Sequence, residues 1–165
     1  MGTASAIPPT GAGHASGLPD SQVATATVAP LAVVGLLAMG HMVIDGACNY
    51  VVARSANVAQ LGWESAVALV VGYNLLAFAT QFLFGWATDY LRLWRAVAVA
   101  GCLFTAAGVA VPWVKPAIVL CGIGNSLYHV GGGAICLMLA RGSAGLPGLF
   151  VAPGDIGVLV GVTLG

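Results

Sequence analysis

Residues 28–53 read VAPLAVVGLLAMGHMVIDGACNYVVA, an apolar stretch that carries His41, Asp45 and Asn49 at intervals of four residues. A helix of ~20 residues crosses the ~30 Å core of a bilayer, so this stretch is long enough to span it. Residues four positions apart lie on one face of a helix, and the three polar side chains therefore share a narrow stripe. Because an ionisable group in hydrocarbon costs from ~2.5 to ~10 kcal/mol or more, we expect this stripe to face a bundle interior.

Four further apolar stretches of similar length follow this one. Nothing in them alternates with period two, and helices then satisfy the backbone polar groups within lipid. The sequence therefore predicts an all-α membrane protein with five transmembrane helices. The predicted bundle covers residues 28–165, with helices at 28–53, 64–86, 96–113, 116–140 and 144–165.

The two ends of the chain differ in character. Residues 1–27 are rich in Gly, Ala, Ser, Thr and Pro, and we expect them to form a disordered tail. The last predicted helix is still apolar at Gly165. We therefore expect the chain to be the N-terminal part of a longer protein.

The composition is that of a membrane protein and excludes nucleic-acid binding. Hydrophobic residues make up 59% of the chain and charged residues 6%, against roughly 25% charged residues in soluble proteins. The formal net charge is zero, so the basic surface that nucleic acids require is missing. The four cysteines lie within apolar stretches and form no C-x-x-C pair. Neither a disulfide framework nor a redox motif is expected.

Polar side chains are spread unevenly over the other predicted helices. Residues 96–113 carry one clearly polar side chain, Thr105, so we expect this helix at the lipid-facing periphery. Asn125 and His129 repeat the four-residue spacing and share a face of their helix. The remaining candidates are Asn74 and Gln81 in the second helix, and Asp155 after Pro153 in the fifth.

Two interpretations of the pair His41 and Asp45 remain open. In the first, a histidine neutralises a buried carboxylate one turn away and the pair only holds helices in register. In the second, the pair is a proton site. Burial and a nearby imidazolium act on a carboxyl group in opposite senses, which can poise it for proton exchange near neutral pH. Two interpretations of His129 also remain open: it lines a cavity, or it has a structural role.

Glycines predict close helix packing in two places. Gly157, Gly161 and Gly165 recur every four residues in the fifth helix, a spacing that lets two helices approach closely. The run of three glycines at 131–133 weakens its helix locally, or admits a neighbouring helix or a substrate.

The loop between the second and third helices, GWATDYLRLWR at 85–95, resembles the signature of the major facilitator superfamily. Tyr90 and Trp94 stand where basic residues are usual, and Arg92 stands where glycine is usual. The matching positions are Gly85, Asp89 and Arg95.

The first, fourth and fifth predicted helices resemble a narrower branch of this superfamily. The pair His41-x-x-x-Asp45, the segment GIGNSLYH at 122–129 and the glycine-rich fifth helix look like fosmidomycin-resistance-type drug exporters. Val130 follows the histidine where that branch tends to have proline. The resemblance covers about Val28 to Gly165, which corresponds to the N-terminal half-bundle without its sixth helix.

The resemblance implies a facilitator-type six-helix half-bundle and a secondary active transporter. Such a protein moves a small molecule, such as a drug, by proton-coupled alternating access around a site near the midplane. The first and fourth helices then line the cavity and the second and fifth act as gates. The implied substrate and proton site is His41, Asp45, Asn49, Asn125 and His129. The implied gating residues are Gly85, Asp89, Arg95, Asn74, Gln81, Pro153 and Asp155.

The expected location is the bacterial inner membrane, with a cytoplasmic N-terminus. In that orientation Arg92, Arg95 and Arg141 lie inside, against Arg54 and Lys115 outside, as the positive-inside rule favours. The expected partners are the lipid bilayer, a small-molecule substrate, protons, and a missing C-terminal half-bundle or a second copy.

Two alternatives to a transporter remain. One is a haem-binding membrane cytochrome with His41 and His129 as axial ligands. The other is a structural or assembly membrane protein. An enzyme is not expected, because no nucleophile elbow accompanies Ser126. For the transporter we expect no cofactor and no metal ion.

Overall fold

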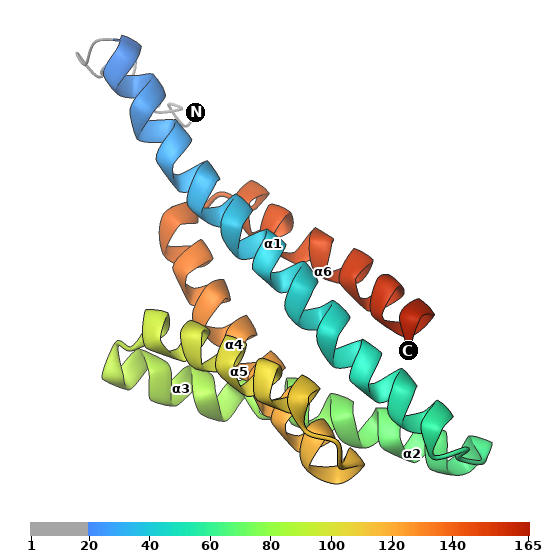
Figure 1. The fold of residues 1–165 in the computed structure, drawn as a ribbon. Helices are drawn as coiled ribbons and strands as arrows, with labels where there is room; N and C mark the ends of the chain where they lie inside the picture. The colour runs from blue at the N-terminus through green and yellow to red at the C-terminus, as the bar shows by residue number, and fades with distance from the viewer. Residues whose placement is uncertain (1–19) are drawn as a thin grey trace, which may run out of the picture.

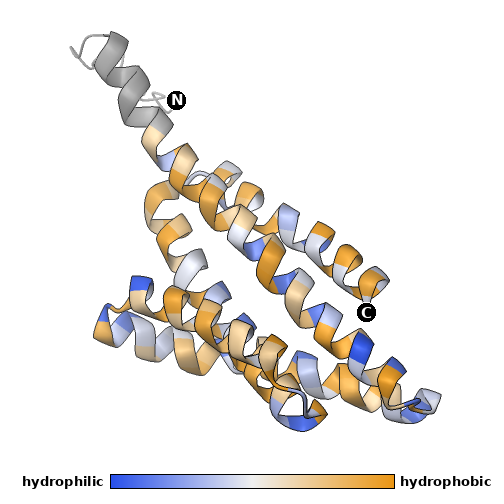
Figure 2. Ribbon diagram, in the orientation of Figure 1, coloured by the Kyte–Doolittle hydropathy of each residue, from blue (hydrophilic) through white to orange (hydrophobic). Residues whose placement is uncertain are grey.

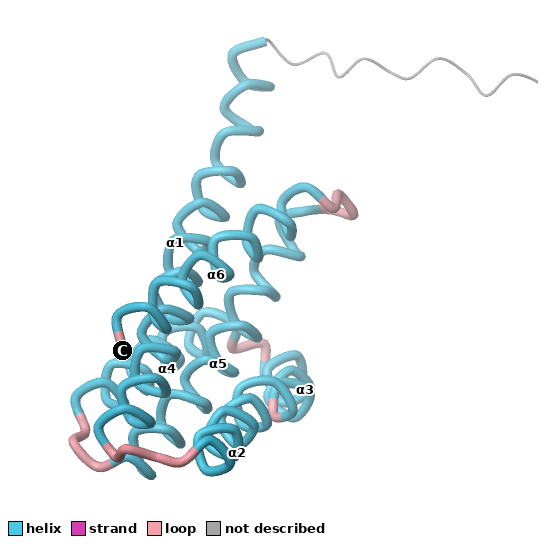
Figure 3. Tube along the Cα trace, turned by 90° about the vertical axis from the view of Figure 1, so that its right-hand side faces the viewer, coloured by secondary structure: helices cyan, strands magenta, loops and turns pink. Residues whose placement is uncertain are grey.

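The protein is described by a computed structural model that covers residues 20–165, with side chains from residue 29 onward. Every regular element in this range is a helix (Figures 1 and 3). The elements are α1 (Asp20–Val58), α2 (Trp63–Asn74), the π-helical turn η1 (Leu75–Ala79), α3 (Gln81–Leu91), α4 (Trp94–Ala110), α5 (Val114–Ala140) and α6 (Gly145–Leu164).

Within the described residues, four helical segments are long and apolar enough to cross a membrane. They are Ala29–Val58, Trp63–Leu91, Val114–Ala140 and Gly145–Leu164. The prediction of an all-helical chain with membrane-spanning helices is confirmed at this level. The remaining apolar helix, α4, is shorter, with 17 residues.

Four helix ends differ from the prediction by three residues or more. α1 ends at Val58 rather than at residue 53, and α3 ends at Leu91 rather than at residue 86, so most of the loop predicted at 85–95 is helical. The other two are the end of α4 and the start of α1.

α4 ends at Ala110 rather than at residue 113, because the residue before Pro112 is disfavoured in helical conformation, and Val111 is extended with ψ of 128°. α1 begins at Asp20, so it includes residues 20–27, which were assigned to the tail. Hydropathy marks the part of a helix that can lie in lipid, not the end of the helix itself. The rest of the predicted tail lies outside the described residues.

The second membrane segment contains a π-helical turn that the sequence did not predict. η1 separates α2 from α3 and is followed by Thr80. The Thr80 hydroxyl donates to the Leu76 carbonyl oxygen at 2.6 Å and lies 2.8 Å from Ser126 Oγ on α5. Single π-turns of this kind are frequent at functional sites. This one brings the middle of the segment into polar contact with α5.

Glycines let α1 lie against α6 at backbone distance. A Cβ added at Gly157 would meet the Met42 carbonyl oxygen, and one added at Gly161 would meet the Gly46 carbonyl oxygen. Each addition would overlap backbone rather than a flexible side chain. The predicted glycine stripe of the fifth helix therefore packs on the first helix.

Glycines also let α4 pack closely against α5. A Cβ at Gly124 would come within 2.5 Å of Thr105 Oγ1, and one at Gly101 within 2.5 Å of the Tyr128 backbone nitrogen. Gly131, the first of the run of three, faces the Ala98 backbone. The run of glycines therefore admits a neighbouring helix, which is one of the alternatives predicted from the sequence.

The polar and apolar residues are arranged inside out relative to a soluble protein. Large apolar side chains such as Leu36, Phe82 and Leu103 are exposed, and hydrophilic residues gather at the turns and along the middle of α1 (Figure 2). The buried polar and charged residues are His41, Asp45, Ser55, Thr88, Thr105, Asn125 and Ser126. Because lipid tails solvate exposed apolar side chains, this arrangement suits a bilayer and places the polar groups inside.

Candidate functional site

The polar stripes of α1 and α5 meet inside the bundle. His41 and Asp45 on α1 are 3% and 8% exposed, and Asn125 on α5 is 1% exposed. His129 lies one turn beyond Asn125 and is partly buried. Four of the five residues of the predicted binding site therefore come together.

Three of these side chains form a contiguous group, which we name the His–Asp–His cluster: His41, Asp45 and His129. The Nε2 atoms of the two histidines are 2.7 Å apart. His41 Nε2 lies 3.1 Å from Asp45 Oδ2, and His129 Nε2 lies 3.9 Å from Asp45 Oδ1. Asn125 donates from Nδ2 to Asp45 Oδ1 at 2.6 Å. The carboxylate is thus held from both helices.

Backbone carbonyl groups fix the protonation of both imidazole rings. His41 Nδ1 is 2.8 Å from the Phe150 carbonyl oxygen, and His129 Nδ1 is 2.9 Å from the Asn125 carbonyl oxygen. A carbonyl oxygen only accepts, so each Nδ1 carries the proton and donates it. In neutral rings both Nε2 atoms are then acceptors. Two lone pairs and a carboxylate then converge on one point, so the site takes either a proton on one Nε2 atom or a bound cation.

α6 covers the cluster. The Phe150 ring stacks on His41, with centroids 4.7 Å apart and an interplanar angle of 17°. A Cβ added at Gly154 would come within 2.7 Å of Asp45 Oδ2 and of His41 Cε1. Pro153 lacks a backbone N–H and disturbs the preceding turn, where the Phe150 carbonyl lies. The Pro153-Gly154 pair thus lets α6 sit directly on the cluster.

A groove of about 410 Å³ leads from the loop after α3 to the cluster. His129 is the cluster member that lines it. The other lining residues are Gly85, Asp89, Trp94, Val130, Gly133, Ala134, Leu137 and Met138. The groove therefore lies between α3, α4 and α5 and borders the cluster at His129.

Three predicted residues bond their own helix rather than the cluster. Asn49 Nδ2 donates to the Asp45 carbonyl oxygen at 2.9 Å, so it lies beside the cluster without joining it. Asn74 donates to Val70 O at 2.8 Å, and Gln81 to Ala77 O at 2.9 Å. These donors flank the π-turn.

The remaining gating candidates lie in two regions. Gly85 and Asp89 line the groove, and Asp89 Oδ1 accepts a hydrogen bond from Trp94 Nε1 at 3.3 Å. Arg95 is exposed at the start of α4. Pro153 and Asp155 lie on α6, where Asp155 is exposed next to Gly154.

Sequence reasoning did not identify Phe150 and Gly154 as parts of the site. Phe150 contributes through a backbone carbonyl and an apolar ring, which leave no polar signature in a sequence. The adjacent Pro153-Gly154 pair was the available signal, because it marks a place where a helix opens and another group approaches closely.

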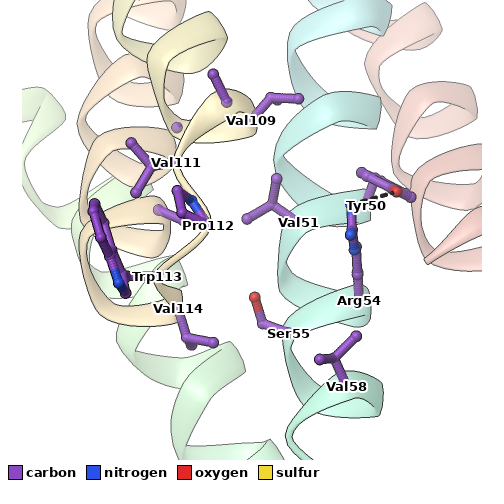
Figure 4. Close-up of a pocket in the computed structure, with 13 residues that line it drawn as sticks. Tyr50, Val51, Arg54, Ser55, Val58, Val109, Val111, Pro112, Trp113 and Val114 are labelled. Atoms are coloured by element: carbon purple, nitrogen blue, oxygen red, sulfur yellow. Dashed lines mark hydrogen bonds between the residues drawn. The ribbon is translucent and has the colours of Figure 1, made fainter.

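A second cavity, of about 270 Å³, lies at the opposite end of the bundle, between α1 and the α4–α5 turn (Figure 4). Arg54 donates to the Tyr50 hydroxyl at 3.1 Å on its wall. The other labelled walls are mostly valines with Pro112 and Trp113. No histidine, cysteine or carboxylate lines it, so the chemistry of the described residues centres on the His–Asp–His cluster.

No family model, curated protein or solved structure matches the chain. The helices are compatible with a multi-pass integral membrane protein. Function must therefore be inferred from the cluster and its surroundings.

Proposed function

We propose that the chain is a secondary active transporter, or the N-terminal part of one, that moves a small molecule across the membrane by alternating access. The observation that carries the proposal is the His–Asp–His cluster, which gathers three acceptor atoms inside an apolar helix bundle. Ionisable groups at such depth mark ion or substrate pathways more often than structural sites.

A purely structural ion pair is the main competing interpretation. A structural pair would satisfy its own charges and would be sealed from solvent. Here the acceptors must take up a proton or another cation, and His129 borders a groove at the α3–α4 end. A site that takes up a cation and borders a groove supports the exchange of that cation rather than a purely structural ion pair.

Haem ligation is the second alternative. The two Nε2 atoms are 2.7 Å apart, and each ring also donates a hydrogen bond from Nδ1 to a backbone carbonyl oxygen. A porphyrin between them would require both rings to move apart and lose these bonds. The geometry therefore gives this alternative no support.

Two features favour a facilitator-type half-bundle in particular. Arg92 caps α3 in the left-handed conformation with φ of 55°. At this position the major facilitator signature usually has glycine, the residue that adopts positive φ at least cost. The polar stripes also lie on α1 and α5, the first and fourth helices of the predicted bundle.

We further propose that a second helix bundle covers part of this one. Asp155 on α6 and Asn74 on α2 are exposed although both lie within membrane-length helices. A carboxylate facing lipid at that depth costs at least ~2.5 kcal/mol. A C-terminal half-bundle or a second copy of the chain would cover these groups.

Transport of a dye tests the proposal. The full chain is expressed in a bacterium that lacks its own drug exporters, and accumulation of ethidium and other fluorescent cations is measured. Wild-type protein should change the accumulation of at least one dye when a second copy of the chain supplies the opposing half-bundle. Asp45→Asn should abolish the change at equal abundance in the membrane, because it removes the charge that holds the cation.

Leu36→Ala is the matched control, because Leu36 is exposed on the same helix, and this variant should behave as wild type. Accumulation that is the same with wild type and with Asp45→Asn for every dye would refute the proposal.

A further inference from the structure

We propose that the His–Asp–His cluster is a binding site for a divalent first-row transition-metal ion of the Zn²⁺ type. The ligands are Nε2 of His41, Nε2 of His129 and the carboxylate of Asp45, whose atoms all lie within 4.8 Å of one another. Metal binding by these residues does not depend on transport. Only the further consequence, that this metal is the cation loaded during the cycle, rests on the proposed function.

The ligand spacing matches such an ion. Tetrahedral Zn²⁺ with bonds of about 2.0–2.1 Å sets its ligand atoms about 3.3 Å apart. The two Nε2 atoms are 2.7 Å apart, His41 Nε2 is 3.1 Å from Asp45 Oδ2, and His129 Nε2 is 3.9 Å from the other oxygen, Oδ1. With one atom taken from each residue the ligands lie within 4.8 Å of one another, so rotation of the side chains can bring them to the spacing that the metal sets.

The groups behind the ligands orient them for a metal. A histidine that binds a metal through one nitrogen usually donates its other N–H to a carbonyl or carboxylate. Both histidines do so, to the Phe150 and Asn125 carbonyl oxygens, and both therefore present a lone pair at Nε2. Asp45 is itself held by Asn125 Nδ2. Each of the three ligands is thus supported.

Asn125 supplies an independent sign that a ligand is needed. Its Oδ1 atom is buried and has no hydrogen-bond partner among the described residues. Its orientation is fixed, because an ionised carboxylate only accepts and Nδ2 must therefore face Asp45. The unpaired oxygen lies on the same amide group, next to the cluster. A water molecule on the metal would donate to it and complete the coordination.

Gly154 limits what can occupy the site. Because a single Cβ at Gly154 would overlap Asp45 and His41, α6 leaves no room for an added side chain against these two ligands. The groove at His129 supplies the entry path that a buried metal site needs.

The mixed donor set selects the class of metal. Imidazole nitrogen suits Zn²⁺, Co²⁺, Ni²⁺ and Fe²⁺, whereas Mg²⁺ and Ca²⁺ prefer oxygen donors. A single proton shared between the two Nε2 atoms is the competing occupant. It would satisfy the imidazole pair but would leave Asn125 Oδ1 without a donor.

Co²⁺ binding to the purified full chain in detergent tests the inference. The tag is removed, and His14→Gln and Cys102→Ser are introduced so that another imidazole and an exposed thiol do not bind metal. The protein should bind one Co²⁺ per chain with the visible absorption of a low-coordinate site. Zn²⁺ should displace the Co²⁺, and excess Mg²⁺ should not.

Single substitutions identify the ligands. His41→Gln, His129→Gln and Asp45→Asn should each lower the Co²⁺ affinity by at least about tenfold, with helical content checked by circular dichroism. His129→Gln is the safest of the three, because its ring borders the groove. Glu64→Gln is the matched control and should bind as wild type, since Glu64 is an exposed carboxylate in the first turn of α2.

Two results would overturn the inference and leave a proton as the cation. One is folded protein that takes up no stoichiometric Co²⁺. The other is Co²⁺ affinity in all three ligand variants that equals the wild-type affinity. The dye experiment separates the two proposals. Asp45-dependent dye transport without metal binding rejects the metal site alone, whereas metal binding without any transport rejects the transporter alone.

Discussion

At the scale of single residues, Asn125 organises the site. Its side chain donates to Asp45 on α1, while its backbone carbonyl accepts from His129 one turn on. One residue therefore sets the position of the carboxylate and the protonation of one imidazole. Removing its amide would leave the buried Asp45 carboxylate without this donor.

Asn125→Ala should accordingly lower the free energy of unfolding by about 1–3 kcal/mol, the range for a buried hydrogen bond to a charged group. Asn74→Ala is the control, because that exposed amide bonds only its own helix, and it should change stability by no more than about 0.5 kcal/mol. Thermal unfolding in detergent compares the two. Equal losses would show that Asn125 does not brace Asp45.

Helical spacing predicted which side chains of the candidate site come together, except for Asn49. Spacing of four residues placed His41 and Asp45 on one face and Asn125 and His129 on another, and these faces meet. The same spacing also lets Asn49 reach back to the Asp45 carbonyl oxygen. Helical periodicity cannot distinguish a side chain that faces a neighbouring helix from one that bonds its own backbone.

At the scale of helices, glycines decide which pairs pack closely. The stripe of α6 predicted a close partner, but spacing within one helix does not identify that partner. Only the structure shows that Gly157 meets α1 and that Gly131 meets α4. The π-turn η1 was also beyond prediction, because no residue type marks it. The close packing of α6 on α1 is what brings the Phe150 carbonyl to His41.

Gly157→Ala should therefore destabilise the protein by about 1–3 kcal/mol, the usual cost of overpacking, because its Cβ overlaps the Met42 carbonyl oxygen. Gly35→Ala is the matched control in α1, where a Cβ would meet no described atom within 4 Å. There the better helix propensity of alanine should stabilise by up to about 1 kcal/mol. Thermal unfolding should move in opposite directions for the two variants. A stabilised Gly157→Ala would contradict the backbone contact.

At the scale of the whole molecule, the charged residues outside the cluster sit mainly at two ends of the bundle. α4 separates these ends, since it begins next to Arg92 and finishes before Lys115. Residues at the first end are Asp89, Arg92, Arg95 and Arg141, and those at the second are Arg54, Glu64 and Lys115. The groove to His129 opens at the first end and the cavity beside Arg54 lies at the second.

This arrangement fixes what labelling of the protein in intact cells should show. Single cysteines are placed at residue 92 or residue 115 in a cysteine-free background and treated with a membrane-impermeant maleimide. Residue 115 should react from outside and residue 92 only after the cells are opened, because the arginine-rich end is expected in the cytoplasm. The groove to His129 would then open to the cytoplasm. Reaction of residue 92 from outside would reverse that orientation, and reaction of both residues from one side would show that α4 does not cross the membrane.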